Sequence, residues 1–457
     1  MAFLTLEDMK IVVSLVCCCL GVGSLGLAGN YARAGYVAAT IAFILMAIIN
    51  TYATWCLCKV LVVAPKSILT LGDLGDWCFG RVGKYFSLIF QCLLCAMYPI
   101  VYLVLGGTLL STLFPMSFSQ TTWLILMAIT LLPVCLVPTM KEGAGMALAG
   151  GLATVLADGI ALALLITNME DVNPAGISPP SPEITFTSVT TVFGNLAFAY
   201  ASAHAPHLAC RARHHHVFFF AVALLGVFSA GCQTPNNLLF AISGSKLGFA
   251  ASRGYVVLAF LCMQFHITIA FAVIFFPVFQ ILERLVLGLH KDRDMVVVLE
   301  KDVETPALDD DVESATFHAV VEGGPREEVK AYRAPGSYFK ASLVRTALIA
   351  VCVVIAVIWK NHLNALVDFV GASASALVNM ILPMVFYLKT FWPSIKWPEK
   401  IFAFVCILIA VFLGVYVSIQ TGKDLFSPET ADPTILFPLC PAAFQQVVFT
   451  NTTYYHY

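Results

Sequence analysis

Long apolar stretches, separated by short polar segments, dominate the chain. A stretch of about 20 mainly apolar residues is long enough to cross the hydrocarbon core of a bilayer as an α-helix. The chain has about 11 such stretches: Met9–Ala34, Tyr36–Val60, Tyr85–Leu113, Thr121–Val137, Gly150–Asn168, Val189–Leu208, Val217–Cys232, Gly254–Leu287, Ala341–Trp359, Leu363–Leu388 and Lys400–Ile419. This pattern predicts an all-α polytopic membrane protein.

The composition agrees with this class. Hydrophobic residues make up 60% of the chain and charged residues only 11%, whereas a soluble domain carries roughly 25% charged residues. The net charge is −2, and the sequence has no cluster of basic residues with interleaved aromatic residues. No nucleic-acid partner is therefore expected. Most cysteines lie inside apolar stretches as small hydrophobic side chains. Cys232 and Cys440 could both lie on the non-cytosolic side and form a disulfide. No metal or organic cofactor is expected.

The positive charges predict the orientation. With the N-terminus in the cytosol, only five of the 25 Lys and Arg residues fall in non-cytosolic segments: Arg33, Lys246, Arg253, Lys360 and Lys423. Lys and Arg gather on the cytosolic side of membrane proteins. An odd number of spans then places the C-terminus on the non-cytosolic side, where Asn451 would be a glycosylation acceptor. Both the plasma membrane and a vacuolar or other endomembrane fit this pattern.

The sequence divides into four segments. Residues 1–289 hold spans one to eight, and residues 341–420 hold spans nine to eleven. Between them, residues 290–340 carry 12 of the 27 acidic residues and few apolar clusters, which is typical of a flexible cytosolic loop. This loop is either an unconstrained linker or the binding site of a regulatory partner. Residues 421–457 form a non-cytosolic tail.

Two of the apolar stretches are interrupted. The first contains Gly21, Gly23 and Gly26, and each glycine in a helix costs about 1 kcal/mol relative to alanine. The sixth contains a run of small residues before Pro206, whose ring removes a helix hydrogen bond. Interrupted helices at corresponding positions of two halves are typical of a transporter substrate site. Close helix packing through small residues is the alternative for the first break.

The spacing of the two breaks predicts the architecture. The breaks lie five spans apart, and a repeat with an odd number of spans inverts in the membrane. Spans one to five and six to ten are therefore predicted to be inverted five-helix repeats that meet near the midplane, with one extra helix at the end.

Polar side chains inside a membrane are costly and often functional. Asp158 is the most unusual of them, an acid in the otherwise apolar fifth stretch. It could bind a proton during transport or pair with a buried donor. His204 and His207 titrate near neutral pH when unperturbed, with a hydrogen bond inside the bundle as their other role. The further pocket candidates are Asn195, Ser202, Gln264, His266 and Asn379.

Several motifs, taken in order, resemble the amino acid/auxin permease family. They are Gly21-Val22-Gly23-Ser24-Leu25-Gly26 with Ala34-Gly35-Tyr36, Leu71-Gly72-Asp73-Leu74-Gly75, Phe193-Gly194-Asn195-Leu196-Ala197-Phe198-Ala199-Tyr200, Pro277-Val278-Phe279-Gln280 and Ile381-Leu382-Pro383-Met384. The resemblance covers about residues 9–420. It implies the inverted-repeat fold of amino acid transporters, usually with eleven spans, and amino acid transport coupled to protons or sodium.

The resemblance also implies roles for residues at the two breaks. At the first break, the backbone would donate hydrogen bonds to a substrate carboxylate from Gly21, Val22, Gly23 and Ser24. At the second, the substrate's amino group and side chain would meet Phe198, Ala199, Tyr200 and Ser202. The asparagine that often precedes the glycines in the sodium-using branch is absent, which favours a proton. His207 stands where the family usually has a glutamate after the proline, so Asp158, His204 and His207 are all candidates for the coupling group.

These observations predict a secondary active transporter that moves amino acids by alternating access with a proton as the coupling ion. The alternative is a sensor that keeps the same fold and binds an amino acid without transporting it. An enzyme is not expected, because the sequence has no nucleophile with a base and no metal-ligand cluster near a membrane face.

Overall fold

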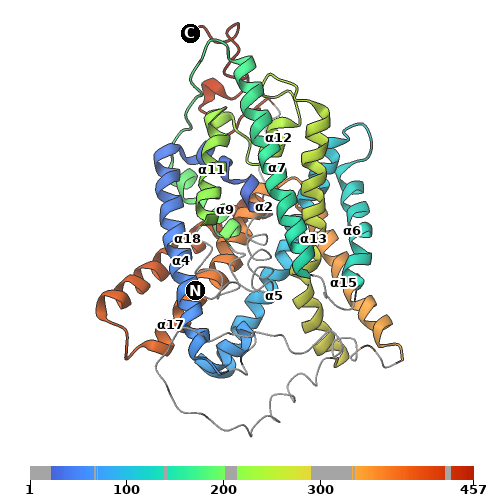
Figure 1. The fold of residues 1–457 in the computed structure, drawn as a ribbon, viewed down its shortest axis with the longest axis vertical. Helices are drawn as coiled ribbons and strands as arrows, with labels where there is room; N and C mark the ends of the chain where they lie inside the picture. Colours follow the sequence, from blue (N-terminus) through green and yellow to red (C-terminus); the bar gives the residue numbers. More distant parts are fainter. Residues whose placement is uncertain are drawn as a thin grey trace, which may run out of the picture.

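The computed structural model describes residues 22–65, 68, 70–137, 143–200, 214–289, 332, 335–427 and 434–457. Within these residues the chain is helical and forms no strand (Figure 1). This confirms the predicted all-α class.

Seven helical segments are long and apolar enough to cross a membrane. They are α4 (Tyr36–Val63), α5 (Leu71–Leu113), α7 (Gly143–Val172), α13 (Arg253–Leu287), α15 (Ser337–Ile358), α18 (Trp397–Phe426) and the segment 363–391, which joins α16 (Leu363–Val370), η5 (Gly371–Ser375), η6 (Leu377–Ile381) and α17 (Leu382–Phe391). Shorter apolar helices fill three more of the predicted spans: α6 (Gln120–Leu136), α8 (Phe186–Thr190) with α9 (Val192–Ala199), and α11 (His214–Phe228).

The first predicted span holds α2 (Val22–Leu25) and α3 (Leu27–Ala34). Each predicted transmembrane stretch therefore contains helix among its described residues. The short elements η2 (Gly231–Gln233), α12 (Leu238–Ile242) and η7 (Ala442–Phe444) lie outside the long spans.

Two helices begin earlier in the chain than predicted. α5 begins at Leu71 rather than near Tyr85, because Thr70 and Asp73 form a capping box that starts the helix earlier. Gly80, with a φ of 67°, then turns the chain into the membrane-spanning part. α15 begins at Ser337, inside the predicted acidic segment.

The tenth span contains two π-helical segments, η5 and η6, which no sequence pattern had indicated.

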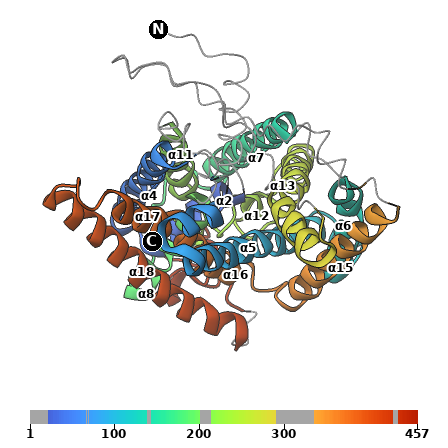
Figure 2. The ribbon, with the colours of Figure 1, turned by 90° about the horizontal axis from the view of Figure 1, so that it is seen from below.

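The broken helices lie between two apolar clusters. Leu25 and Phe198 belong to one cluster, together with residues of α5, α6, α7 and α13. Leu27 and Ala199 belong to the other, together with residues of α4, α11 and α17. Seen along the bundle, α18 lies on one flank and α6 with α15 on the opposite flank, with α2 between them (Figure 2). This arrangement places both broken helices inside the bundle.

The C-terminal tail caps one end of the molecule (Figure 1). A disulfide joins Cys232 to Cys440, as the sequence had suggested. The buried Gln233 side chain donates hydrogen bonds of 3.0 Å to the backbone carbonyls of Phe444 and Val447, and its Oε1 accepts one from Phe449 N. The described part of the tail is therefore fixed onto the segment that follows α11.

Candidate functional site

The first break is a turn at Gly26, between α2 and α3, where Gly26 N donates to the carbonyl of Gly23 over 3.2 Å. A side chain at Gly23 would place its Cβ 2.6 Å from the Cα of Ala199, the last residue of α9. Only glycine permits so close a backbone approach. The first break and the end of α9 are therefore in direct contact, as the repeat of five spans predicted. Gly21 lies outside the described residues.

The helix before the predicted second break, α9, ends at Ala199 with Tyr200 as its C-cap, and residues 201–213 lie outside the described structure. Ser375 Oγ donates to the carbonyl of Ala197 over 2.8 Å, and Tyr98 OH donates to the carbonyl of Phe198 over 3.1 Å. The Tyr98 ring also stacks on Phe198, with 4.4 Å between centroids. Other spans thus satisfy the carbonyls at this helix end, as backbone at membrane depth requires. Ser202, His204 and His207 lie outside the residues that the structure describes.

Asp158 lies in α7, beside the first break. Its side chain is buried, and its Oδ2 accepts a hydrogen bond of 2.7 Å from Ser24 Oγ. Among the described residues, Asp158 takes part in no ion pair, and its Oδ1 has no hydrogen-bond partner. A charged carboxylate buried without a cationic partner costs free energy, and a bound proton removes that charge. The fold therefore brings together Ser24 and Asp158, two candidates that the sequence had proposed for different roles.

A hydrogen bond between two amide side chains also joins α3 to α9, about one helical turn beyond Gly26. Asn30 Nδ2 donates to Asn195 Oδ1 over 3.0 Å, and a Cβ at Gly26 would lie 2.7 Å from Asn195 Nδ2. Asn195 is buried. Its side chain thus joins α9 to α3 and lines the space beside the first break.

The remaining pocket candidates lie on other helices. His266 in α13 contacts the carbonyl of Gly150 in α7 through Nδ1 over 3.1 Å, about two helical turns before Asp158. Gln264 faces α5, where a Cβ at Gly106 would lie 3.2 Å from its Oε1. Asn379 donates to Ser375 Oγ over 3.0 Å. Through Ser375, Asn379 is linked to the carbonyl of Ala197 near the end of α9, whereas His266 and Gln264 contact other helices. The roles of all three residues stay predictions.

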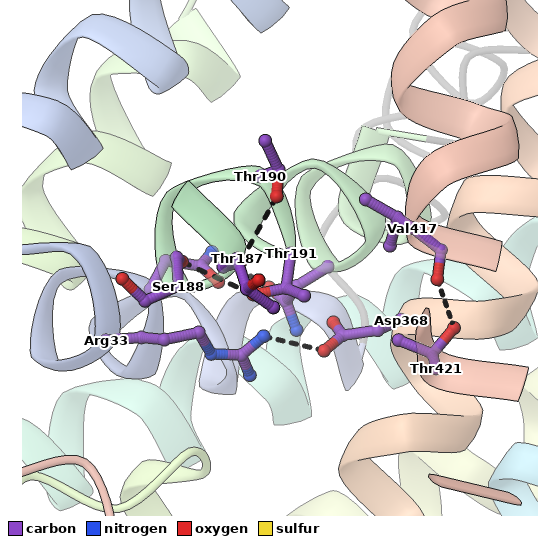
Figure 3. A network of polar contacts seen from close by, with 10 residues as sticks. Arg33, Thr187, Ser188, Thr190, Thr191, Asp368, Val417 and Thr421 are labelled. Carbon is purple, nitrogen blue, oxygen red and sulfur yellow. Dashed lines mark hydrogen bonds and ion pairs between the residues drawn. The ribbon is translucent and has the colours of Figure 1, made fainter. Parts of the chain in front are cut away.

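An ion pair between Arg33 and Asp368 lies on the outer side of the first break. Arg33 at the end of α3 and Asp368 in α16 face each other beside the α8–α9 corner and α18 (Figure 3). Arg33 Nη1 lies 2.7 Å from Asp368 Oδ2, and the two side chains are only 12% and 5% exposed. Charges this deeply buried are stable only when paired.

Arg33 and Asp368 line two cavities. The inner cavity, of about 20 Å³, is also lined by Val22, Gly26 and Asn195. The outer cavity, of about 360 Å³, extends to Asp424 and to Leu439 of the tail. A cavity of about 20 Å³ holds roughly one water molecule. The ion pair therefore separates a spacious outer cavity from a nearly filled inner one.

Asp368 was not among the residues predicted for the site. The signal was available, because Asp368 is an acid inside a predicted span, the same feature that had singled out Asp158. Arg33 had been counted only as a non-cytosolic positive charge. Their pairing could not be predicted, since the two residues are 335 positions apart.

The chain matches the family described as "Transmembrane amino acid transporter protein" over residues 8–206 and 214–422. No curated protein matches the sequence. The solved structure of MhsT in complex with L-phenylalanine is 12% identical to it with a TM-score of 0.51, and the match covers 92% of this chain and 100% of MhsT. This likeness shows a shared fold.

Two other solved structures match with lower scores. The manganese transporter of Eremococcus coleocola, in complex with an aromatic bis-isothiourea substituted compound, is 12% identical with a TM-score of 0.47, and the match covers 93% of this chain and 89% of that one. Mhp1, a nucleobase-cation-symport-1 family transporter, is 10% identical with a TM-score of 0.39, and the match covers 95% and 94%.

Proposed function

Because this chain belongs to the transmembrane amino acid transporter protein family, we propose that it couples amino acid movement to a proton by alternating access. The protein is an integral membrane amino acid transporter. One observation carries the proton coupling: the buried carboxylate of Asp158, without an ion-pair partner among the described residues, accepts a hydrogen bond from Ser24 at the first break. His204 and His207 remain candidates for a second proton-binding group.

The amino acid binds between the two broken helices. Backbone amides of Gly21, Val22, Gly23 and Ser24 hold its carboxylate, while Phe198, Ala199, Tyr200 and Ser202 meet its amino group and side chain. The close approach of Gly23 to Ala199 supports this placement, since it brings both sets of groups to one point. A partial positive charge at a helix N-terminus favours such a carboxylate.

Ser24 connects the proton to the substrate. An ionised carboxylate can only accept hydrogen bonds, whereas a protonated one can also donate. The hydroxyl of Ser24 donates to Asp158, and protonation of Asp158 lets this hydrogen bond reverse, so that Asp158 donates and the Ser24 oxygen accepts. Proton binding and substrate binding therefore support each other at neighbouring atoms.

The ion pair of Arg33 and Asp368 acts as the non-cytosolic gate. It lies between the outer cavity and the first break, and its closure isolates the substrate site from that side. Opening this gate and closing the cytosolic side in alternation would move the substrate across the membrane.

Uptake into proteoliposomes tests the proposed function. A mixed pool of labelled amino acids is supplied outside, under an imposed pH gradient, with and without sodium. We expect accumulation when the outside is acidic, a decline as the outside pH rises toward the inside pH, and no requirement for sodium. Accumulation only with sodium contradicts proton coupling. Binding without accumulation under any gradient supports the sensor instead.

Gly23→Ala should strongly reduce this uptake. The added Cβ would lie 2.6 Å from the backbone of Ala199, so the two broken helices must move apart. Overpacking of this kind costs on the order of 1–3 kcal/mol, and we expect uptake to fall about tenfold. Gly159→Ala is the matched control, because a Cβ at Gly159 in α7 meets nothing within 4 Å among the described atoms. Unchanged uptake by Gly23→Ala would show that the breaks need not touch.

We also propose the orientation deduced from the charges, with the N-terminus cytosolic and the tail non-cytosolic. The disulfide of Cys232 and Cys440 in the tail supports it, since disulfides persist in oxidising compartments. Asn451, exposed on the tail, is then the glycosylation site. The acidic segment 290–340 is the place for a regulatory partner in the cytosol. The membrane is the plasma membrane or a vacuolar or other endomembrane.

A further inference from the structure

His266 in α13 is a buried histidine whose side chain is only 5% exposed. Its Nδ1 contacts the carbonyl of Gly150 in α7 over 3.1 Å. Because a carbonyl only accepts hydrogen bonds, Nδ1 carries the proton, and Nε2 of the neutral ring has a lone pair. Nε2 is buried and has no hydrogen-bond partner among the described residues. The contact with α7 therefore fixes the tautomer in which Nε2 can bind a proton.

The face of α7 that contacts His266 also carries Asp158. α7 and α13 lie side by side (Figure 1 and Figure 2). Gly150, Thr154 and Asp158 are buried and follow one another at intervals of four residues, so they lie on one face of the helix. The Thr154 hydroxyl donates to the same Gly150 carbonyl over 3.2 Å. Polar groups thus continue from Asp158 toward His266 along about 12 Å of helix.

Both ends of this polar line have a buried atom without a partner. Asp158 Oδ1 and His266 Nε2 make no hydrogen bond to any described residue. Leaving a buried polar atom unpaired costs free energy, so packing alone does not account for two such atoms on neighbouring helices. Groups that exchange a proton need such atoms, because the arriving proton must have a lone pair to bind.

Other ionisable groups do not bind His266. The helices α5, α6, α7, α12 and α15 pack against α13. The buried charged and titratable side chains on these helices and on α13 are Asp158, Cys78, Tyr98, Tyr102, Cys135, Arg345, Cys352 and Glu283, with the half-buried Cys262 one turn before His266. None of them forms a hydrogen bond or an ion pair with His266 in the described structure. Arg345 and Glu283 pair with each other, so Asp158 is the acid of this set without an ion-pair partner.

We propose that His266 is a relay that takes the proton from Asp158 toward the cytosol. α7 begins at Gly143, on the cytosolic side in the proposed orientation, so Gly150 and its partner His266 lie between Asp158 and the cytosol. The inference rests on the proposed proton coupling through Asp158.

The relay works in the state that is open to the cytosol. The O–H bond of protonated Asp158 breaks, water molecules beside Thr154 pass the proton on, and an N–H bond forms at His266 Nε2. Asp158 becomes a carboxylate and the ring becomes an imidazolium. The imidazolium then releases its proton to cytosolic water and returns to the neutral tautomer that Gly150 fixes.

Burial suits His266 to passing a proton on rather than storing it. An imidazolium buried without a carboxylate partner costs free energy, so the proton does not remain there. A relay changes the rate at which Asp158 loses its proton, but it leaves unchanged the equilibrium that the pH gradient sets. Loss of the relay should therefore slow accumulation without lowering the final level.

His266→Asn tests the relay in proteoliposomes. The asparagine amide can still donate to the Gly150 carbonyl, but no titratable nitrogen remains. We expect the initial rate of uptake of the labelled amino acid pool under a pH gradient to fall about tenfold. A positioned proton-transfer group contributes about 10²–10⁴-fold to the step it serves, and conformational steps share control of the overall rate. The final level of accumulation, and the rate of exchange of labelled for unlabelled amino acids at equal pH, should match those of the wild-type protein.

Two further variants complete the test. Thr268→Val is the matched control on α13, because the Thr268 hydroxyl donates to the Gln264 carbonyl of the same helix; it should change none of the three quantities. His266→Gln also lacks a titratable nitrogen, and it is measured alongside in case asparagine at this position prevents folding.

Three results would overturn the relay while the proposed function stands. The first is an unchanged initial rate in both His266 variants. The second is exchange that slows as much as uptake, which a purely structural role of His266 would produce. The third is a lower final level, since a relay acts on the rate alone. A wild-type protein that does not accumulate the pool under a pH gradient contradicts the proposed function itself, so the two failures are distinguishable.

Discussion

Asp158→Asn is expected to reduce amino acid accumulation to the level reached without a pH gradient. Asparagine has nearly the same shape, and its amide oxygen can still accept the hydrogen bond of 2.7 Å from Ser24. It cannot bind a proton, however. The substrate site should therefore stay intact while the driving force is lost. Uptake under an imposed pH gradient measures the loss directly.

Exchange without a gradient separates coupling from folding in this variant. Asp158→Asn should still exchange labelled for unlabelled amino acids across the membrane, because exchange requires no net proton movement. Asp171→Asn, at the exposed end of the same helix α7, is the control and should accumulate substrate like the wild-type protein. If Asp158→Asn still accumulates substrate, the proton binds elsewhere, and His204 and His207 become the leading candidates.

Arg345→Ala is expected to destabilise the fold more than any other single change considered for this protein. The Arg345 guanidinium in α15 is 2% exposed and makes four hydrogen bonds of 2.6–2.9 Å, to Glu283 Oε1, Tyr332 OH and the carbonyls of Cys135 and Val137. Removing it takes away the charge that Arg345 places 2.6 Å from Glu283, which is fully buried in α13. Breaking a buried pair in this way costs about 3–5 kcal/mol.

Thermal unfolding of the purified protein in detergent measures this loss. Arg345→Lys keeps the charge but cannot reproduce the planar set of donors, so its melting temperature should lie between those of the wild-type protein and Arg345→Ala. Lys340→Ala, at an exposed position of the same helix, should leave the melting temperature unchanged. Equal melting temperatures for Arg345→Ala and Lys340→Ala would mean that Glu283 is neutral or finds another partner.

The network around Arg345 also bears on the acidic segment 290–340. Tyr332, one of its few described residues, donates a hydrogen bond of 2.6 Å to Glu283 Oε2 and accepts one from Arg345. The end of this segment is therefore attached to α13 and α15. Composition alone had suggested a flexible loop up to Lys340, because acidic runs rarely bury apolar surface. It gave no indication that a tyrosine near the end joins a buried ion pair.

Local patterns were enough to predict the helices and the first break. Apolar length alone identifies a membrane span, so each predicted stretch contains a helix in the structure. Glycine acts on the backbone at its own position, which is why the turn at Gly26 could be expected. Pro206, on which the predicted second break depends, lies outside the described residues. The π-helical segments of the tenth span were not predicted, because no local residue signature indicated them; in the structure η5 packs against α9 and α18, and η6 against α4 and α18.

The sequence by itself determined the membrane class and the place of the first break, since these depend on residues close together in the chain. The orientation suggested by the charges stays a prediction. Only the tertiary structure decided which polar groups meet. Ser24 contacts Asp158 across 134 positions, and Arg33 contacts Asp368 across 335. No local preference encodes such pairs. They form because a polar side chain buried in the bundle without a hydrogen bond costs free energy. The packing of whole spans determines which residue of another helix lies within hydrogen-bonding distance.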